Sequence, residues 1–332
     1  MTPLVIPFFI PHQGCPQRCI FCNQQSITSV NAVKTLTADD ISQGINSWLG
    51  WAKKGREVQV AFYGGSFTGL ERERQQELLE AVQPFIDQGK VDCIRLSTRP
   101  DYIDDEIAAF LKSYRVRTVE LGVQSLDDNV LAASHRGHTV SQVIAAFACL
   151  RRTGFTVGAQ LMIGLPGETT INVLAGARQL AELRPDLVRI YPALVIAGSG
   201  LARLYEQGEY KPLSLNKAVA LCAGIKIIFA NNGIRVVRMG LQPSAGLEKE
   251  VVAGPYHPAF GELVQSRILF QQIRQQLRGS QGKKELHLAA ADESFFRGRN
   301  NMNRKRLEEL GLLQGITVHF KRTQARNTII LK

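Results

Sequence analysis

The sequence has no apolar segment long enough for a membrane protein. No run reaches about 18 uninterrupted apolar residues, which is the length that a membrane-spanning helix needs. The N-terminus, Met1 to Val5, lacks the basic stretch and following apolar stretch that begin a secretory signal. We therefore expect a cytoplasmic protein with no membrane partner.

Several familiar catalytic patterns are also missing. We find no Ser-His-Asp set, no pair of catalytic carboxylates, no Walker phosphate loop and no internal repeat. The hydrophobic content of 45% and the charged content of 21% are typical of globular proteins. The 332 residues suffice for one large domain with an appendage.

Cysteine is scarce, with 6 residues in the chain. Three cysteines stand singly in apolar segments and are interpreted as core thiols rather than as disulfides or ligands: Cys93, Cys149 and Cys222. No second pair of closely spaced cysteines exists.

The other three cysteines, Cys15, Cys19 and Cys22, have the spacing C-x3-C-x2-C and follow an apolar run that predicts a first strand. Three thiolates of one loop can hold three corners of a cubic iron–sulfur cluster and leave the fourth iron open to a cofactor or substrate. A structural zinc site usually needs four ligands in two pairs, and only His12 could be proposed as the fourth. The spacing therefore favours a cluster over zinc.

Strand and helix patterns alternate after the cysteine loop. The expected strands cover residues 5–10, 58–63, 93–97, 118–123, 156–163 and 187–191, and the expected helices cover residues 37–54, 71–88, 104–113, 140–153 and 170–183. Six strands alternating with helices predict a parallel sheet wound in one sense. The fold class is therefore α/β, a partial (β/α)6 TIM-like barrel.

Each predicted strand is followed by a polar or glycine-rich cluster. After the cysteines, these clusters are Gly64-Gly65-Ser66, Ser97-Thr98-Arg99, Gln124-Ser125, Gly164 to Glu168, and Tyr191-Pro192. The carboxyl ends of the strands of a β/α barrel form one rim, where active sites are built. We therefore expect these clusters to converge.

The cysteine stretch, with Phe21 before its last cysteine, resembles the signature of radical S-adenosylmethionine (SAM) enzymes. Residues 120–127, 134–139 and 162–168 resemble motifs of the oxygen-independent coproporphyrinogen III oxidases and of the Elongator catalytic subunit, and residues 97–102 and 189–212 resemble the radical SAM domain of the Elongator subunit. The likeness covers about residues 6–243. It implies a [4Fe–4S] cluster on Cys15, Cys19 and Cys22, with SAM on the open iron, and an enzyme that cleaves SAM reductively to a 5′-deoxyadenosyl radical.

The resemblance also implies roles for particular residues. Gly64 and Gly65 would meet the SAM amino group, Gln124 its ribose, and the guanidinium fork of Arg136 its carboxylate. The expected SAM contacts are Phe21, Gly64, Gly65, Ser66, Ser97, Gln124, Arg136, Gln160 and Gly164. Arg99, Glu120 and Tyr191 are expected at the rim, where the substrate meets the radical.

The chain departs from both families at specific points. Its cysteine spacing is that of the porphyrin enzymes, whereas Elongator subunits space these residues more widely. Ser97 stands where both families usually have Glu, and Gln160 where the porphyrin enzymes have Asp. We expect the likeness to exclude the acetyltransferase domain of Elongator subunits, so the use of acetyl-CoA is not carried over from the resemblance.

A core domain of residues 1–250 and a basic α+β appendage of residues 251–332 are predicted. The appendage is expected to hold helices over residues 263–277 and after residue 306, and strands over residues 285–290, 316–322 and 327–331. From Arg267 to Lys332, fourteen Lys and Arg stand against five Asp and Glu, a net charge of +9. Such an excess favours a polyanionic partner.

Five basic residues within ten positions are the expected RNA contacts: Arg297, Arg299, Arg304, Lys305 and Arg306. Their charges would meet phosphates, while Phe295 or Phe296, if exposed, would stack on an unpaired base. The alternative is a solvated helix start with both phenylalanines in the core. In the first case, reversing the charges at residues 304–306 would weaken tRNA binding and its salt dependence.

Three functions remain open at this stage. The first is a radical SAM enzyme that modifies a base in RNA, with tRNA as a partner. The second is a radical SAM oxidoreductase acting on a small molecule such as a porphyrin precursor. The third is a non-catalytic iron–sulfur protein that binds RNA or relays electrons. For an enzyme, the resemblance implies SAM and an electron donor such as a flavodoxin or ferredoxin as partners.

Overall fold

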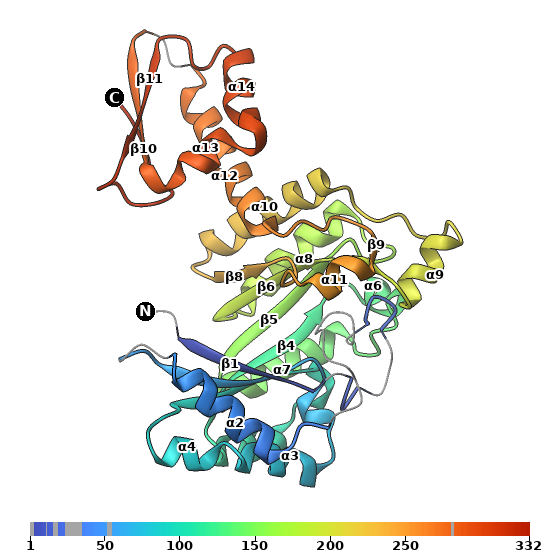
Figure 1. Ribbon diagram of the computed structural model, residues 1–332. Coiled ribbons are helices and arrows are strands. Elements are labelled where there is room, and N and C mark those ends of the chain that lie inside the picture. The colour runs from blue at the N-terminus through green and yellow to red at the C-terminus, as the bar shows by residue number, and fades with distance from the viewer. Residues whose placement is uncertain (1–2, 11, 16–18, 24–34, 52–54, 280–281) are drawn as a thin grey trace.

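A computed structural model describes residues 3–10, 12–15, 19–23, 35–51, 55–279 and 282–332. Its main feature is a seven-stranded sheet in the order β1-β2-β3-β4-β5-β6-β8 (Figure 1). The strands are β1 (Leu4–Phe9), β2 (Val58–Tyr63), β3 (Cys93–Thr98), β4 (Val116–Gln124), β5 (Thr156–Ile163), β6 (Leu187–Pro192) and β8 (Arg235–Met239). Every neighbouring pair is parallel, and β1 and β8 are the two edges. The predicted partial barrel is confirmed, because the sheet curls without joining its edges.

The seventh strand, β8, was not among the predicted strands. Its five residues carry an arginine at positions 235 and 238, and none of its side chains is fully buried. An edge strand pairs on one side only and needs no continuous apolar run. The expectation of six strands was therefore one strand short.

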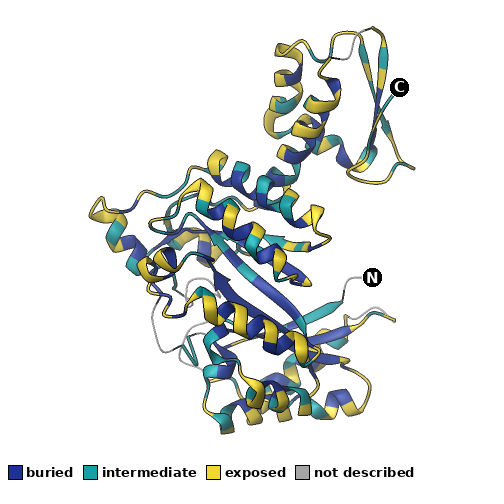
Figure 2. Ribbon diagram, turned by 180° about the vertical axis from the view of Figure 1, so that it is seen from behind, coloured by how far each residue is buried: buried dark blue, intermediate teal, exposed yellow. Residues whose placement is uncertain are grey.

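Helices cover the outer face of the sheet. They are α2 (Ala38–Leu49), α3 (Arg72–Glu80), α4 (Gln83–Asp87), α5 (Asp105–Ser113), α6 (Asp128–Ala133), α7 (Val140–Arg152), α8 (Thr170–Glu182) and α10 (Leu215–Asn231). Figure 2 shows buried residues on the strands and on the helix faces toward them, with exposed residues on the opposite faces. Strands covered in this way are mostly apolar, as in β2, where Val58 to Phe62 are all buried and Gln59 alone is polar.

Local sequence explains where several helices begin and end. Thr37 accepts a hydrogen bond from the Asp40 N–H and begins α2 with a capping box, and Thr139 with Gln142 does the same for α7. The single helix predicted over residues 71–88 is divided into α3 and α4. Pro84 lies in the first turn of α4, where a missing N–H costs little, but the same residue interrupts a longer helix.

The segment after β6 holds β7 (Val195–Ile196), α9 (Gly200–Glu206), α11 (Ala245–Glu250) and β9 (Val251–Ala253), and β7 pairs with β9. A second, three-stranded sheet follows, in the order β11-β10-β12, from β10 (Lys284–Ala289), β11 (Ile316–Lys321) and β12 (Ile329–Leu331). Two helices of this region are α13 (Glu293–Arg297) and α14 (Met302–Glu309). None of the described helices is long and apolar enough to cross a membrane.

Helix α12 (Phe260–Leu277) joins the two sheets. Phe260, Val264 and Ile268 belong to the hydrophobic core of the barrel, whereas Leu269 to Leu277 belong to a separate cluster with β10 and α14. In Figure 1 the C-terminal sheet stands apart from the barrel at the far end of this helix. The first half of α12 thus packs with the barrel, although it lies within the predicted appendage. The domain boundary after residue 250 stays a prediction.

Candidate cofactor-binding cavity

A cavity of about 710 Å³ lies on the inner face of the curled sheet. Every strand of the sheet contributes at least one residue to its wall, from Val5 in β1 to Arg238 in β8. Cys15, Cys19 and Cys22 line the same cavity. The topology therefore brings the cysteine loop and the strand ends together, as expected for the rim of a β/α barrel.

Most of the predicted contacts also line this cavity. They are Phe21, Gly64, Gly65, Ser66, Ser97, Arg99, Gln124, Arg136, Gln160 and Tyr191. Two predicted residues do not: Gly164 and Glu120. Gly164 lies in the loop after β5, where its N–H donates to Glu168 and its carbonyl accepts from Tyr210, and Glu120 is completely buried.

Within the described part of the chain, the three cysteines do not form a site for a single metal ion. Among the described residues, no three His, Cys, Asp or Glu side chains could hold a single metal ion. This arrangement is compatible with a cubic cluster, because each thiolate of such a cluster binds a different iron. Burial raises the pKa of Cys15 above its ordinary value, although Arg136 acts to lower it.

The glycine turn after β2 packs against the cysteine loop. A Cβ atom on Gly65 would lie 2.4 Å from the Gln13 carbonyl oxygen, and one on Gly14 would lie 2.1 Å from the Ser66 carbonyl oxygen. The Ser66 N–H donates to Gln13 (3.0 Å), and the His12 N–H donates to Gly64 (3.1 Å). Only glycine permits backbones to approach so closely, so this turn positions the cysteine loop.

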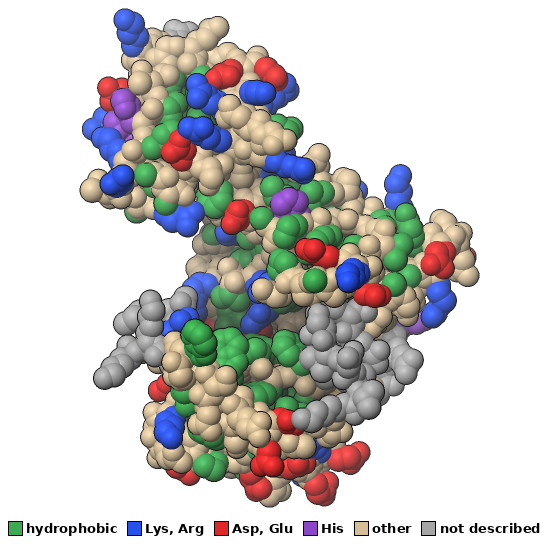
Figure 3. Space-filling model, viewed as in Figure 1, with side chains coloured by type: hydrophobic (Ala, Val, Ile, Leu, Met, Phe, Trp, Pro, Cys, Tyr) green, Lys and Arg blue, Asp and Glu red, His purple; other side chains and the backbone are tan. Residues whose placement is uncertain are grey.

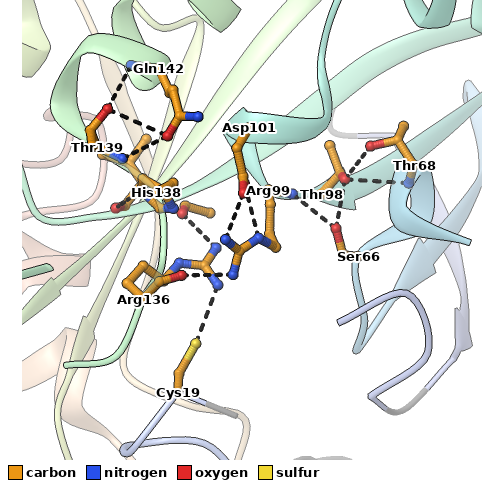
Figure 4. A network of polar contacts seen from close by, with 12 residues as sticks. Cys19, Ser66, Thr68, Thr98, Arg99, Asp101, Arg136, His138, Thr139 and Gln142 are labelled. Carbon is orange, nitrogen blue, oxygen red and sulfur yellow. Dashed lines mark hydrogen bonds and ion pairs between the residues drawn. The ribbon is translucent and has the colours of Figure 1, made fainter. Parts of the chain in front are cut away.

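Arg136 connects the cysteine loop to the middle of the sheet. Its Nη1 donates to the Cys19 sulfur (3.4 Å), and its Nη2 donates to the Gly122 carbonyl oxygen (2.8 Å) (Figure 4). Its Nε is buried, and no described residue offers it a hydrogen-bond partner. A buried guanidinium N–H without a partner favours an anionic acceptor, and this donor fits the carboxylate of SAM.

A polar network holds the neighbouring loops (Figure 4). Arg99 donates to both carboxylate oxygens of Asp101 (2.9 and 2.7 Å) and to the Arg136 carbonyl (2.7 Å). The Thr98 hydroxyl lies 2.6 Å from that of Thr68 and 3.0 Å from that of Ser66. These contacts join the loops after β2, β3 and α6. The sequence analysis did not identify Asp101, whose only signal is its place two residues after an arginine.

Gln124 has an unusual backbone conformation at the end of β4. Its φ is 66°, in the left-handed region that non-glycine residues rarely adopt. The register between β4 and β5 shifts between Leu121 and Gln124. Strain of this kind concentrates at functional sites, which supports a role for Gln124 in binding.

A buried ionic network forms the floor of the cavity. Glu120 accepts from Arg95 (3.1 and 2.5 Å), from Arg189 Nε (2.5 Å) and from the Tyr63 hydroxyl (2.8 Å). Burial alone would raise the pKa of Glu120, but Arg189 and Arg95 together hold it below its ordinary value. Gly158 leaves room for this carboxylate, since a Cβ there would lie 2.8 Å from Glu120 Cγ. Glu120 therefore holds Arg189 in position from the side away from the cavity.

The predicted RNA contacts lie on the C-terminal helices, and none of them lines the cavity. Arg297 pairs with Glu293 on the preceding turn of helix, whereas Arg304 and Arg306 pair with Glu308 and Glu309 on the following turn. Phe296 is buried and Phe295 packs against the same cluster, with Arg326 over its ring. Phe296 thus lies in the core and Phe295 is partly buried beside it, while RNA contact by the neighbouring basic residues stays a prediction.

Related sequences cover mainly the barrel. The chain is 29% identical over 221 residues to an uncharacterized protein of Methanocaldococcus jannaschii, covering 63% of this chain and 66% of that one. It is 36% identical to the tRNA uridine(34) acetyltransferase of Methanocaldococcus infernus, over 52% of this chain and 36% of the relative. It is 32% identical to Elongator complex protein 3 of Saccharomyces cerevisiae, over 51% and 34% respectively. The chain thus spans only about a third of the length of the latter two.

Solved structures show the same fold. The archaeal Methanocaldococcus infernus Elp3 with an N-terminal deletion superposes with a TM-score of 0.65 at 23% identity, over 82% of this chain and 64% of that one. Coproporphyrinogen III oxidase from Escherichia coli, described as a radical SAM enzyme, superposes with a TM-score of 0.51 at 19% identity, over 70% and 53%. These likenesses concern the fold alone.

Two family matches cover the chain from the cysteine loop into α12. Residues 9–175 match the radical SAM superfamily, and residues 185–269 match the radical SAM C-terminal domain. Enzymes of this superfamily use a [4Fe–4S] cluster and SAM. Because the first match alone spans half of the sequence, the chain belongs to the radical SAM superfamily.

Proposed function

We propose that this enzyme modifies a base in RNA, with tRNA as its substrate. The observation that carries the catalytic part is the convergence of three cysteines, a glycine turn and Arg136 on one cavity. Cys15, Cys19 and Cys22 would hold the cluster, which would pass one electron from a donor to SAM and so supply the radical chemistry that removes a hydrogen atom from the substrate.

The residues of the chain have separate tasks in this proposal. Cys15, Cys19 and Cys22 bind the cluster, and Arg136 orients the carboxylate of SAM. The remaining SAM contacts are Phe21, Gly64, Gly65, Ser66, Ser97, Gln124 and Gln160, with Gly164 shaping the loop after β5. Arg99 holds the loop of Arg136, Glu120 holds Arg189, and Tyr191 faces the substrate. The walls exclude water from the reactive carbon.

RNA as the substrate is supported by two observations outside the cavity. Relatives at 30% identity or more include tRNA uridine(34) acetyltransferases and Elongator complex proteins, and the match covers about a third of their length. The last fifth of the chain carries a net charge of +9, which suits a phosphate backbone. Arg297, Arg299, Arg304, Lys305 and Arg306 contact that backbone. We propose a cytoplasmic flavodoxin or ferredoxin as the electron donor.

The catalytic part is tested by anaerobic reconstitution. The wild type is expected to bind about four iron and four sulfide per chain, and the Cys15→Ala, Cys19→Ala and Cys22→Ala variants to bind none. Cys93→Ala, which removes a thiol outside the cavity, is the matched control and should keep the full cluster. Stoichiometric zinc in place of iron contradicts the proposal.

The substrate is tested by the formation of 5′-deoxyadenosine from SAM by the reduced protein. Unmodified tRNA should increase its yield, and mass spectrometry of the tRNA should detect a changed nucleoside. If coproporphyrinogen stimulates the reaction and tRNA does not, the substrate is a small molecule. If SAM is not cleaved under any of these conditions, the protein is a non-catalytic iron–sulfur protein.

A further inference from the structure

Four arginines line the cavity, whereas none of the described residues of its wall is acidic. The described residues of its wall include Arg99, Arg136, Arg189 and Arg238 but no Asp or Glu. Figure 3 shows Lys and Arg side chains inside the hollow between the upper and lower parts of this face. A partly enclosed positive charge is costly unless an anion or a set of hydrogen-bond acceptors accompanies it. The cavity is therefore built to receive negative charge.

The four arginines differ in what already neutralises them. Arg99 is paired with Asp101, and Arg136 lies beside the Cys19 sulfur at the cysteine end. Arg189 shares the single carboxylate of Glu120 with Arg95. No ion pair is found for Arg238 among the described residues, and its Nε donates to the Gly240 carbonyl (3.1 Å). Arg95, Arg189 and Arg238 thus bring three positive charges to this side, whereas Glu120, the partner of the first two, brings one negative charge, which leaves an excess of two positive charges.

Arg189 and Arg238 lie side by side. They are direct partners in the pairing of β6 with β8, and Gln160 is the partner of Arg189 in the pairing of β5 with β6. All three line the cavity. Neighbouring strands are about 4.8 Å apart, so the two arginines lie roughly one and two strand spacings beyond Gln160.

The hydrogen-bond network around Arg189 preorganises this side of the cavity for binding. Glu120 and Tyr63 fix the guanidinium of Arg189 by three hydrogen bonds, so little side-chain freedom is lost when an anion binds. Two adjacent guanidinium groups suit an oxyanion with several acceptors, such as a phosphate.

We propose that Arg189 and Arg238 bind a phosphate group of the substrate nucleotide and thereby set how deeply its base enters the cavity. This inference rests on the proposed function, because a small substrate would present carboxylates to the same two arginines. Arg238 is the more informative residue to change, since it lies outside the Glu120 network.

The test is equilibrium dialysis with the reconstituted protein saturated with SAM, so that the nucleoside site of SAM is filled. The probes are uridine 5′-monophosphate and uridine, with succinate as a carboxylate competitor. We expect the wild type to bind the monophosphate at least tenfold more tightly than uridine. Arg238→Gln should lower the affinity for the monophosphate about tenfold and leave that for uridine unchanged. Arg238→Lys, which retains the charge, should keep most of the affinity.

Arg235→Gln is the matched control, because Arg235 lies on the same strand but is exposed and does not line the cavity. It should bind both probes like the wild type. Equal affinities of the wild type for uridine and its monophosphate, or no effect of Arg238→Gln, would overturn the inference. Displacement of the monophosphate by equimolar succinate would assign the site to carboxylates instead. A wild type that also makes no 5′-deoxyadenosine would overturn the proposed function itself.

Discussion

The missing side chain of Gly122 determines where Arg136 can lie. A Cβ at Gly122 would be 2.6 Å from Nη2 of Arg136, so an alanine must displace the guanidinium from the Gly122 carbonyl. We predict that Gly122→Ala weakens SAM binding by about tenfold, the effect of losing one charge-assisted contact. Equilibrium dialysis with SAM measures the effect.

The matched control for this change is Gly176→Ala in α8, where the nearest atom to the new Cβ would be 3.6 Å away. It should bind SAM normally and keep the melting temperature. Unchanged SAM affinity in Gly122→Ala would show that Arg136 does not hold the cofactor.

Residues with a chemistry of their own were predictable from the sequence, whereas their supporting partners were not. Cysteines at a fixed spacing and paired glycines can be recognised in the sequence, and both line the cavity. Glu120 was expected at the rim. It lies on the expected face of β4, because Glu120, Gly122 and Gln124 are two residues apart and so share one face of the strand. It lies deeper, however, because each residue of a strand adds about 3.3 Å. A sequence pattern thus predicts on which face of a strand a residue lies more readily than how far along the strand it lies from the rim.

Among the elements, the loop from β5 to α8 is expected to respond to pH. Glu168 accepts from the N–H groups of Gly164 and Leu165, and burial raises its pKa to about 7. The pKa of a glutamate in the unfolded chain is lower, near 4.5. Folding is therefore favoured most by this group below about pH 4.5, and that contribution is lost as the pH rises through 7.

We predict that Glu168→Gln flattens this dependence, because an amide accepts the same two hydrogen bonds at every pH. Relative to the variant, the wild-type melting temperature should fall between pH 5 and pH 7.5. Glu182→Gln, at the exposed end of α8, should follow the wild type. Parallel curves for the wild type and Glu168→Gln would mean that the carboxyl group has an ordinary pKa.

Two other elements show why prediction from sequence was incomplete. Helix α10 packs against both α8 and α12, and its apolar residues surround it, so it shows no amphipathic pattern. Strand β8 lies at the edge of the sheet and holds two arginines, so it lacks the apolar run by which a strand is predicted. The predicted elements were those with one buried and one exposed face, or with a full apolar run.

For the whole molecule, the uneven charge predicts salt-sensitive RNA binding through the C-terminal region. Arg304 and Arg306 are exposed and paired with Glu308 and Glu309. Exposed pairs are worth about 1 kcal/mol or less, so a phosphate can replace the glutamates. We predict that reversing both arginines to Glu weakens tRNA binding and reduces the slope of log affinity against log salt by roughly 1.4–1.8.

Reversal of Arg151 and Arg152, two ion-paired arginines on the outside of the barrel, is the matched control. It should leave both quantities unchanged, and iron content and SAM binding should be normal in both variants. If the two reversals behave alike, or if tRNA does not bind even at low salt, the C-terminal region is not the RNA contact.

The shared helix α12 has a consequence for how the molecule comes apart. Its 18 residues extend about 27 Å, and its two halves are buried in different hydrophobic clusters. A break in its hydrogen-bond ladder near Ile268 and Leu269 would expose apolar side chains of both clusters at once. Loss of order in the C-terminal sheet is therefore transmitted to the barrel through fraying of this helix, and the two parts are coupled into one cooperative unit.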